Sequence, residues 1–142
     1  MGIKFRLKAM NFLEFFIWGS WLISLGGYMF SVLNATGSQI GLTYGTMGLA
    51  SLFMPALMGI IADKFVNAEK VLGICHLIGA GLLFWASKVN DPSSMYWVML
   101  LNAMFFMPTI ALNNTVSYIT LEKRGFDIIK DFPPIRVWGT VG

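Results

Sequence analysis

Hydrophobic residues occur in long blocks along this chain, and short clusters of polar and charged residues separate the blocks. Asp, Glu, Lys and Arg are absent from three stretches, residues 15–62, 71–87 and 92–121. At about 1.5 Å per residue, the first stretch is long enough as helix to cross a hydrocarbon core of about 30 Å twice. We therefore predict four membrane-spanning helices and the start of a fifth, over residues 10–33, 39–62, 71–88, 95–121 and 133–142.

The composition supports this interpretation. Hydrophobic residues make up 56% of the chain and charged residues only 12%, whereas a soluble domain carries about 25% charged residues. The net charge of +3 does not indicate a nucleic-acid partner, because the basic residues flank the apolar segments and form no single basic face. We predict an all-α integral membrane protein whose surroundings are the lipid bilayer.

The Lys and Arg residues predict the orientation of these helices. Lys88 alone lies in the connector that the prediction places on the outer side. The other side holds the amino-terminal tail and two connectors, with Lys4, Arg6, Lys8, Lys64, Lys70, Lys123, Arg124 and Lys130. Because basic residues concentrate in cytoplasmic loops, we predict a multi-pass protein of the cytoplasmic membrane with its amino terminus in the cytoplasm.

Small residues and prolines indicate that the helices form a bundle. Gly41 and Gly45 have the small-xxx-small spacing that allows two helices to approach closely in lipid. Pro55 and Pro108 interrupt two spans, which is tolerated where neighbouring helices or water satisfy the freed carbonyl groups.

Glu14 is the first residue that could carry chemistry. Helical spacing places aromatic and apolar side chains on its face, at Trp18, Trp21, Leu25 and Tyr28. An intramembrane carboxylate is costly unless it is paired or protonated, so Glu14 could be a proton or substrate site with Trp18 and Tyr28 as an aromatic wall. Alternatively, Glu14 lies near the cytoplasmic interface and pairs with Lys8.

A stripe of uncharged polar residues runs along the fourth predicted span. Asn102, Thr109 and Asn113 are seven and four residues apart, which places them on one helical face. Such side chains could bind a polar, neutral ligand, or they could form hydrogen bonds between helices.

The only histidine, His76, has no second ligand at suitable spacing, so we predict no metal site. No nucleophile–base pair or phosphate-binding loop suggests an enzyme or an organic cofactor.

The connector after the second span contains Gly59-Ile60-Ile61-Ala62-Asp63-Lys64-Phe65. This segment resembles the signature loop of the major facilitator superfamily. The resemblance implies that Gly59 allows close helix approach, and that Asp63 and Lys64 form a cytoplasmic charge relay for conformational switching.

Further motifs resemble the nucleoside:proton symporters of that superfamily, and they cover the whole chain. They include the closing stretch Asp-Phe-Pro-Pro-Ile-Arg-Val-Trp-Gly-Thr-Val-Gly at residues 131–142. The others are Trp18-Gly19-Ser20-Trp21, Phe53-Met54-Pro55-Ala56-Leu57, Ala62-Asp63-Lys64, Cys75-His76 and Met107-Pro108-Thr109. We therefore interpret the chain as the amino-terminal part of a major-facilitator helical bundle.

The resemblance implies proton-coupled nucleoside transport by alternating access between two six-helix halves. The missing carboxy-terminal half would complete the substrate site and carry the acids that couple H+. Arg136 and Thr140 are then the expected substrate ligands, followed by Asn113 and Thr109. Two alternatives stay open: a sugar:proton symporter of the lactose-permease type, although the fourth span lacks that family's carboxylate, and a four-span small multidrug exporter that uses Glu14.

The depth of Arg136 depends on where the fifth helix begins. If Asp131 caps the helix and Pro133 is its first residue, Arg136 lies in the first turns and could reach the cytoplasm. If the helix begins near Asp127, Arg136 lies about nine residues in, roughly 13 Å deep. The second register is sterically disfavoured, because it places Pro133 and Pro134 inside the helix.

Overall fold

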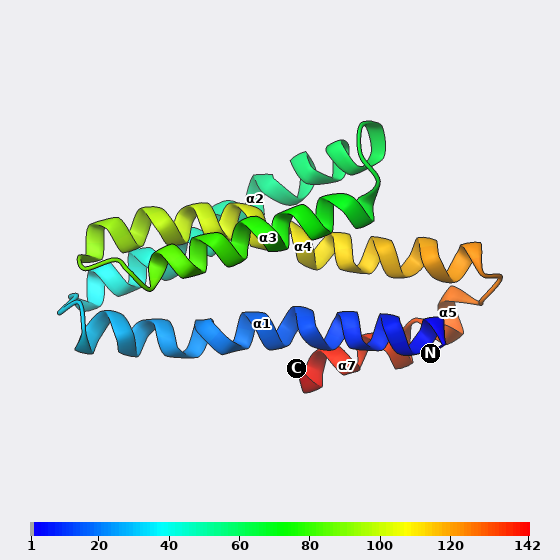
Figure 1. Ribbon diagram of the computed structural model, residues 1–142, viewed down its shortest axis with the longest axis horizontal. Helices are drawn as coiled ribbons and strands as arrows, with labels where there is room; N and C mark the ends of the chain where they lie inside the picture. The colour runs from blue at the N-terminus through cyan, green and yellow to red at the C-terminus, as the bar shows by residue number, and fades with distance from the viewer. Residues whose placement is uncertain (1) are drawn as a thin grey trace. The chain divides into compact units, whose positions relative to one another are not determined.

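The computed structural model describes residues 2–142, which are helical almost throughout and contain no strand (Figure 1). The prediction of an all-α fold is confirmed. The helices are α1 (Ile3–Ser31), α2 (Gly37–Lys64), α3 (Ala68–Ala86), α4 (Pro92–Lys123), α5 (Ile128–Asp131), α6 (Pro133–Arg136) and α7 (Trp138–Val141).

The chain forms two compact units. The terminal unit consists of residues 2–23 and Asn113–Gly142, and the central unit consists of Ser24–Leu112. The terminal unit therefore combines the first part of α1 with the last turns of α4 and the short helices α5, α6 and α7.

In the central unit, α2 packs against α3, and α3 contacts the first part of α4 through Gly79 and Asn102 and through His76 and Phe106. α2 buries Thr43, Thr46, Ala50 and Met54. Gly41 and Gly45 lie on the other side of α2, and a Cβ atom at either would meet nothing within 4 Å in residues 2–142. The close helix approach that this spacing allows therefore stays a prediction, because spacing defines a face but not what covers it.

Two helices of the central unit begin at side-chain caps. Thr36 caps α2, since its hydroxyl accepts a hydrogen bond from the Gln39 backbone N–H while the Gln39 side chain accepts one from the Thr36 N–H. Asp91 lies just before α4, and its Oδ1 accepts a hydrogen bond of 2.8 Å from the Ser94 backbone N–H. Hydrogen bonding to Ser94 lowers the pKa of the Asp91 carboxyl.

The core of the terminal unit draws on three distant parts of the sequence. Leu7 from α1, Leu121 from α4 and Ile135 from α6 are buried together. Four partly buried side chains surround them: Met10, Phe126, Ile128 and Phe132. Burial of this apolar surface holds α5 and α6 against the amino-terminal part of α1.

Three helices of residues 2–142, α2, α3 and α4, are long and apolar enough to cross a membrane. α1 is not among them. It begins at Ile3, seven residues before the predicted span, and therefore includes Lys4, Arg6 and Lys8 in its first turns. The prediction of four crossings thus stays a prediction.

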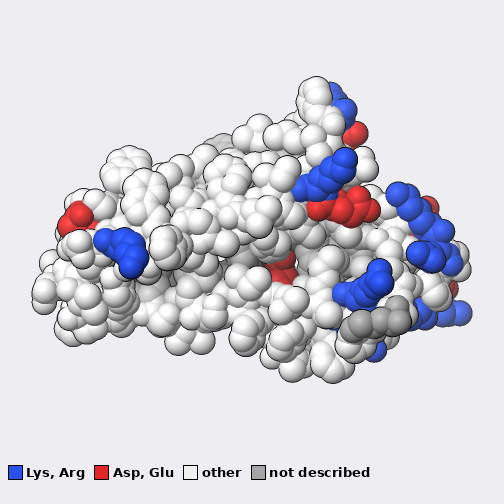
Figure 2. All heavy atoms as spheres, in the orientation of Figure 1, with Lys and Arg blue, Asp and Glu red and all other residues white. Residues whose placement is uncertain are grey.

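Figure 2 shows Lys and Arg side chains gathered at the end of the terminal unit where α1 begins.

Candidate functional site

Arg136 lies beside an aromatic ring of α1. Its guanidinium carbon is 4.4 Å from the centroid of the Phe15 ring, and the side chain is partly buried. A guanidinium over an aromatic face is attracted by the negative charge of the ring face. A guanidinium carries five N–H donors in one plane, so a contact with a ring does not use all of them.

The backbone that carries Arg136 becomes helical earlier than the favoured sequence interpretation allowed. Asp127, not Asp131, caps the first turn, because its carboxylate accepts hydrogen bonds from the backbone N–H groups of Ile129 and Lys130. Asp131 instead forms an ion pair of 2.7 Å with Lys4. The first of the two predicted registers, in which Asp131 is the cap, was therefore wrong.

The prolines are accommodated because the helix is divided into short segments. Pro133 and Pro134 begin α6, where a missing backbone N–H costs least. Phe132 before them and Val137 after α6 both keep right-handed helical backbone angles. The segment from α5 to α7 therefore follows a nearly helical path through the Pro-Pro pair.

A glycine allows this segment to approach α1 closely. A Cβ atom at Gly139 would lie 2.6 Å from Nη1 of Arg136 and 2.7 Å from Cδ2 of Phe15. Both distances are shorter than atoms tolerate, so any larger residue would displace the arginine or the ring. Gly142 is also close to α1, against the backbone of Phe12 and Phe16. The glycines of the closing motif thus set the distance between Arg136 and Phe15.

Arg136 and Thr140 line one open cavity of about 480 Å³. The remaining described lining residues are Phe132, Pro133 and Val137. Thr140 is exposed, so its hydroxyl is accessible from the cavity. The structure therefore brings together the two residues predicted to be the main substrate ligands.

Asn113 belongs to a buried polar cluster in the same unit. Its Nδ2 donates to Oδ1 of Asn11 over 3.3 Å, and the Asn11 Nδ2 donates to the backbone O of Leu7 and to Oγ of Ser117. The Oδ1 of Asn113 is buried and has no hydrogen-bond partner within residues 2–142. Asn113 thus links α4 to α1 by a hydrogen bond to Asn11, while its Oδ1 accepts no hydrogen bond from the described residues.

Glu14 is buried, with 2% of its surface exposed, one helical turn beyond Asn11. This burial is at odds with an exposed position at the membrane interface. Trp18 follows on the same part of α1, with its ring 6.1 Å from that of Phe15. Lys8 lies over the Trp138 ring, 5.9 Å from its centroid.

Two other predicted site residues belong to the central unit. Thr109 is fully buried, and its hydroxyl donates to the backbone O of Phe106 in the preceding turn. The Tyr28 hydroxyl donates to the backbone O of Val89 over 3.4 Å. Both hydroxyls therefore already serve as donors to carbonyl groups of the central unit.

The residues of the predicted switch loop lie at the end of α2. The helix continues through Lys64, so Asp63 and Lys64 belong to its last turn and are exposed. Gly59 lies one turn earlier and is partly buried. Neither charged side chain forms an ion pair with another residue of the described part of the chain.

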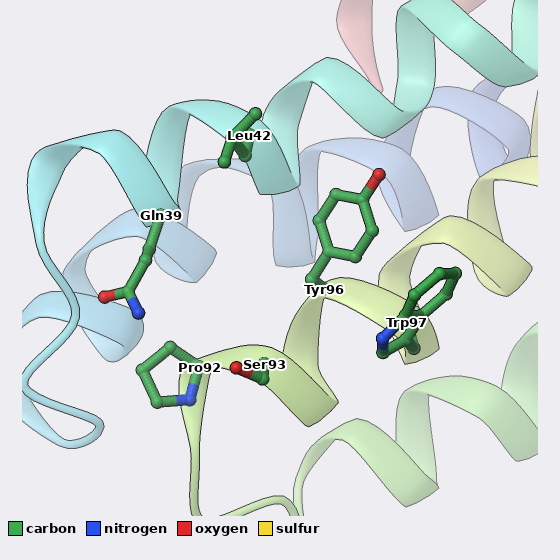
Figure 3. A pocket seen from close by; sticks show the side chains of 6 residues that line it. All are labelled: Gln39, Leu42, Pro92, Ser93, Tyr96 and Trp97. Carbon is green, nitrogen blue, oxygen red and sulfur yellow. The ribbon is translucent and has the colours of Figure 1, made fainter.

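The central unit has an open groove of about 240 Å³ between the first turns of α2 and α4 (Figure 3). Gln39 and Leu42 lie on one side, with Pro92, Ser93, Tyr96 and Trp97 on the other. The Tyr96 and Trp97 rings meet edge to face at 5.3 Å. None of the predicted site residues lines this groove, and aromatic residues such as Tyr96 and Trp97 are typical of membrane interfaces.

Within residues 2–142, no three His, Cys, Asp or Glu side chains are placed to hold a metal ion.

Comparison with known proteins decides the family. Residues 1–142 match the family described as "Nucleoside H+ symporter". The chain belongs to this nucleoside H+ symporter family. It is 56% identical over 142 residues to the xanthosine permease of Escherichia coli (strain K12), and 51% identical to the nucleoside permease NupG of the same organism. These alignments cover the whole of this chain and 34% of each relative.

A solved structure shares the fold. The crystal structure of nucleoside transporter NupG matches with a TM-score of 0.94 at 51% sequence identity, over 99% of this chain and 35% of that chain. The prediction of a nucleoside:proton symporter family with a helical membrane fold is confirmed. The family match also sets aside the lactose-permease and small multidrug alternatives. This symporter-family chain spans about a third of the length of the relatives it matches.

The sequence interpretation missed two residues of the terminal unit. Asn11 lies four residues after buried Leu7 and three before buried Glu14, so helical periodicity on this face could have revealed it. Phe15 gave no comparable signal, because its role depends on contact with Arg136 near the other end of the chain.

Proposed function

We propose that this chain forms part of a proton-coupled nucleoside transporter that works by alternating access. The observation that carries the proposal is the shared cavity of Arg136 and Thr140, with the guanidinium positioned on Phe15. The family description and the printed names of the relatives support a nucleoside as cargo and H+ as coupling ion.

The chemistry of this cavity fits a nucleoside. A guanidinium offers several N–H donors in one plane, which suit the paired hydroxyl oxygens of a ribose. The Thr140 hydroxyl can both donate and accept in the same cavity. Apolar surface from Phe132 and Val137 adds contact area for a nucleobase. Asn113 and Thr109 are secondary ligand candidates in this proposal, with Trp18 and Tyr28 as aromatic walls.

Glu14 is the candidate proton carrier of this chain. Its side chain is buried, with 2% of its surface exposed, in a helix that is otherwise mostly apolar at this point. Replacing Glu14 with Gln keeps the shape of the side chain and removes its carboxyl group. We expect Glu14→Gln to weaken accumulation driven by a pH gradient more than it weakens exchange of labelled for unlabelled nucleoside.

The proposed transporter lies in the cytoplasmic membrane with its amino terminus in the cytoplasm, as the Lys and Arg distribution predicts. Gly59, Asp63 and Lys64 would then act at the cytoplasmic end of α2 as a conformational switch. Their exposed charges leave them free to engage residues outside the described chain when the transporter changes state.

Uptake of labelled uridine into vesicles tests the function directly. The protein at its natural length should accumulate uridine when the exterior is more acidic than the interior, and a protonophore should stop this accumulation. Arg136→Gln should reduce uptake by at least about tenfold, as expected when hydrogen bonds from a charged donor are lost.

Lys130→Gln is the matched control, because it removes the same charge from an exposed side chain of the same segment. Its uptake should stay near that of the unmodified protein. Equal losses in Lys130→Gln and Arg136→Gln would contradict a specific ligand role for Arg136. Accumulation of a galactoside but not of uridine would contradict the nucleoside assignment.

A further inference from the structure

We propose a second binding site, for a phosphate group, formed by Arg6 and Arg124 at the end of the terminal unit. The two arginines line one cavity of about 470 Å³ together with Gly2, Ile3 and Phe126. Arg6 comes from the first turns of α1, and Arg124 directly follows α4. Two chain segments that are far apart in the sequence thus present their guanidinium groups to the same space.

Two lysines at this end of the unit have carboxylate partners, whereas the two arginines have none in the described part of the chain. Lys4 pairs with Asp131 at 2.7 Å, and Lys130 lies 3.9 Å from Asp127. Neither the Arg6 nor the Arg124 guanidinium has an ion pair or a hydrogen bond with another residue between 2 and 142. Two like charges around one cavity repel each other unless an anion lies between them.

The chemistry of the cavity selects a phosphate group as that anion. A guanidinium matches two oxygens of a phosphate at once, and two guanidinium groups can bind one phosphate from two sides. Phe126 adds an apolar wall to the cavity. A ligand with a phosphate beside hydrocarbon therefore fits better than a bare carboxylate or an inorganic ion.

The place of the two arginines along the chain points to a phospholipid headgroup. The charge-free stretch of α1 begins at residue 15, and that of α4 ends at residue 121. Arg6 lies before the first stretch and Arg124 just after the second, so both are at the level where apolar helix gives way to polar surface. Basic pockets between transmembrane helices at this level bind anionic lipid headgroups. This inference is independent of what the protein transports.

Lipid titration followed by native mass spectrometry tests the site. The protein at its natural length, freed of lipid in a neutral detergent, is titrated with phosphatidylglycerol, phosphatidylcholine or inorganic phosphate. We expect phosphatidylglycerol to bind at least about tenfold more tightly than phosphatidylcholine, since only the former has an uncompensated phosphate charge. Arg6→Gln and Arg124→Gln should each weaken this binding by about fivefold or more.

Lys123→Gln is the matched control, because Lys123 precedes Arg124, is exposed and does not line the cavity. Its affinity for phosphatidylglycerol should stay within about twofold of the unmodified protein. Arg124→Lys keeps the charge but not the planar group, so it should bind more weakly than arginine and more tightly than glutamine. This variant also keeps the test informative if Arg124→Gln unfolds, which a thermal melt would show.

The outcomes separate the possible sources of the phosphate. Tight phosphatidylglycerol binding that depends on both arginines, with weak binding of inorganic phosphate, supports a lipid occupant. Equally tight binding of inorganic phosphate supports the phosphate site but assigns it to a free ion. Similar losses in Lys123→Gln and the two arginine variants, or no loss in any, would overturn the proposal, because the attraction would then be general surface charge.

Discussion

The guanidinium carbon of Arg136 lies 4.4 Å from the centroid of the Phe15 ring, so the last helices of the chain and its first helix meet at a charged group and an aromatic face. The contact is between the guanidinium carbon and the face of the ring, and a ring face offers no acceptor of the strength of a hydroxyl or carboxylate. The contact therefore orients the N–H donors without using all of them, as a binding site for hydroxyl groups requires.

The first prediction concerns Phe15. Phe15→Leu keeps an apolar side chain but removes the ring face, which is worth about 0.5–2 kcal/mol to a guanidinium. We expect the KM for uridine to rise by about two- to tenfold while the amount of folded protein stays the same. Phe15→Tyr keeps the ring face and should restore the KM. An unchanged KM in Phe15→Leu would show that the ring does not position Arg136.

Gly139 provides a test of the distance between the same two groups. A Cβ atom there would lie 2.7 Å from the Phe15 ring and 2.6 Å from Arg136, so Gly139→Ala must displace one of them. We expect a rise of at least about fivefold in the uridine KM. Gly73→Ala is a suitable control, because that glycine meets nothing within 4 Å in the described structure. Equal KM values for both variants would contradict this prediction.

The buried amides allow a double-mutant cycle. Asn11→Leu leaves the Asn113 Nδ2 without its partner, while the Ser117 hydroxyl loses one donor but still donates to the backbone O of Asn113, so the free energy of unfolding should fall by about 1–2 kcal/mol. Adding Asn113→Leu should cost less than the sum of the two single changes, because the unpaired amide is removed as well. Thermal or denaturant unfolding in detergent measures the three variants. Strict additivity would show that the two amides do not interact.

The ion pair between Lys4 and Asp131 predicts a salt-dependent effect on stability. Lys4→Asp should lower the free energy of unfolding by more than the roughly 0.2–1 kcal/mol of an exposed pair, because it also places two carboxylates together and removes the Lys4 contact with the Phe126 ring. The combined change Lys4→Asp with Asp131→Lys should recover most of this loss at low ionic strength. Melting temperatures measured at low and high salt provide the comparison, and the recovery should shrink as salt screens the pair.

Asp91 predicts a pH dependence in the central unit. Hydrogen bonding to Ser94 lowers the pKa of its carboxyl below its ordinary value. The native state therefore favours the ionised form, and this contribution to stability is present above the unfolded pKa and lost as pH falls through the lower, folded pKa. Between about pH 5 and about pH 2, the melting temperature should fall more for the unmodified protein than for Asp91→Asn. Equal losses in both would contradict a role for this carboxylate.

Several features were predictable from the sequence because they depend on local order. Helix positions follow from charge-free stretches and from caps such as Thr36, whose partner Gln39 is three residues away. The buried face of α1 around Glu14 follows from helical periodicity. The family followed from motifs spread along the whole chain, and the match over residues 1–142 confirms it. The sequence placed Arg136 and Thr140 one turn apart on a common face, whereas the cavity that they line is known only from the structure.

Only the tertiary structure decided which distant residues meet. Asp131 could have capped a helix, but the fold places it against Lys4 and leaves capping to Asp127. Gly41 and Gly45 have the spacing of a packing face, but α2 packs through its opposite side. The contact of Arg136 with Phe15 arises because the segment after α4 returns along α1. Periodicity describes each helix by itself, whereas such contacts depend on how the loops turn one helix toward another.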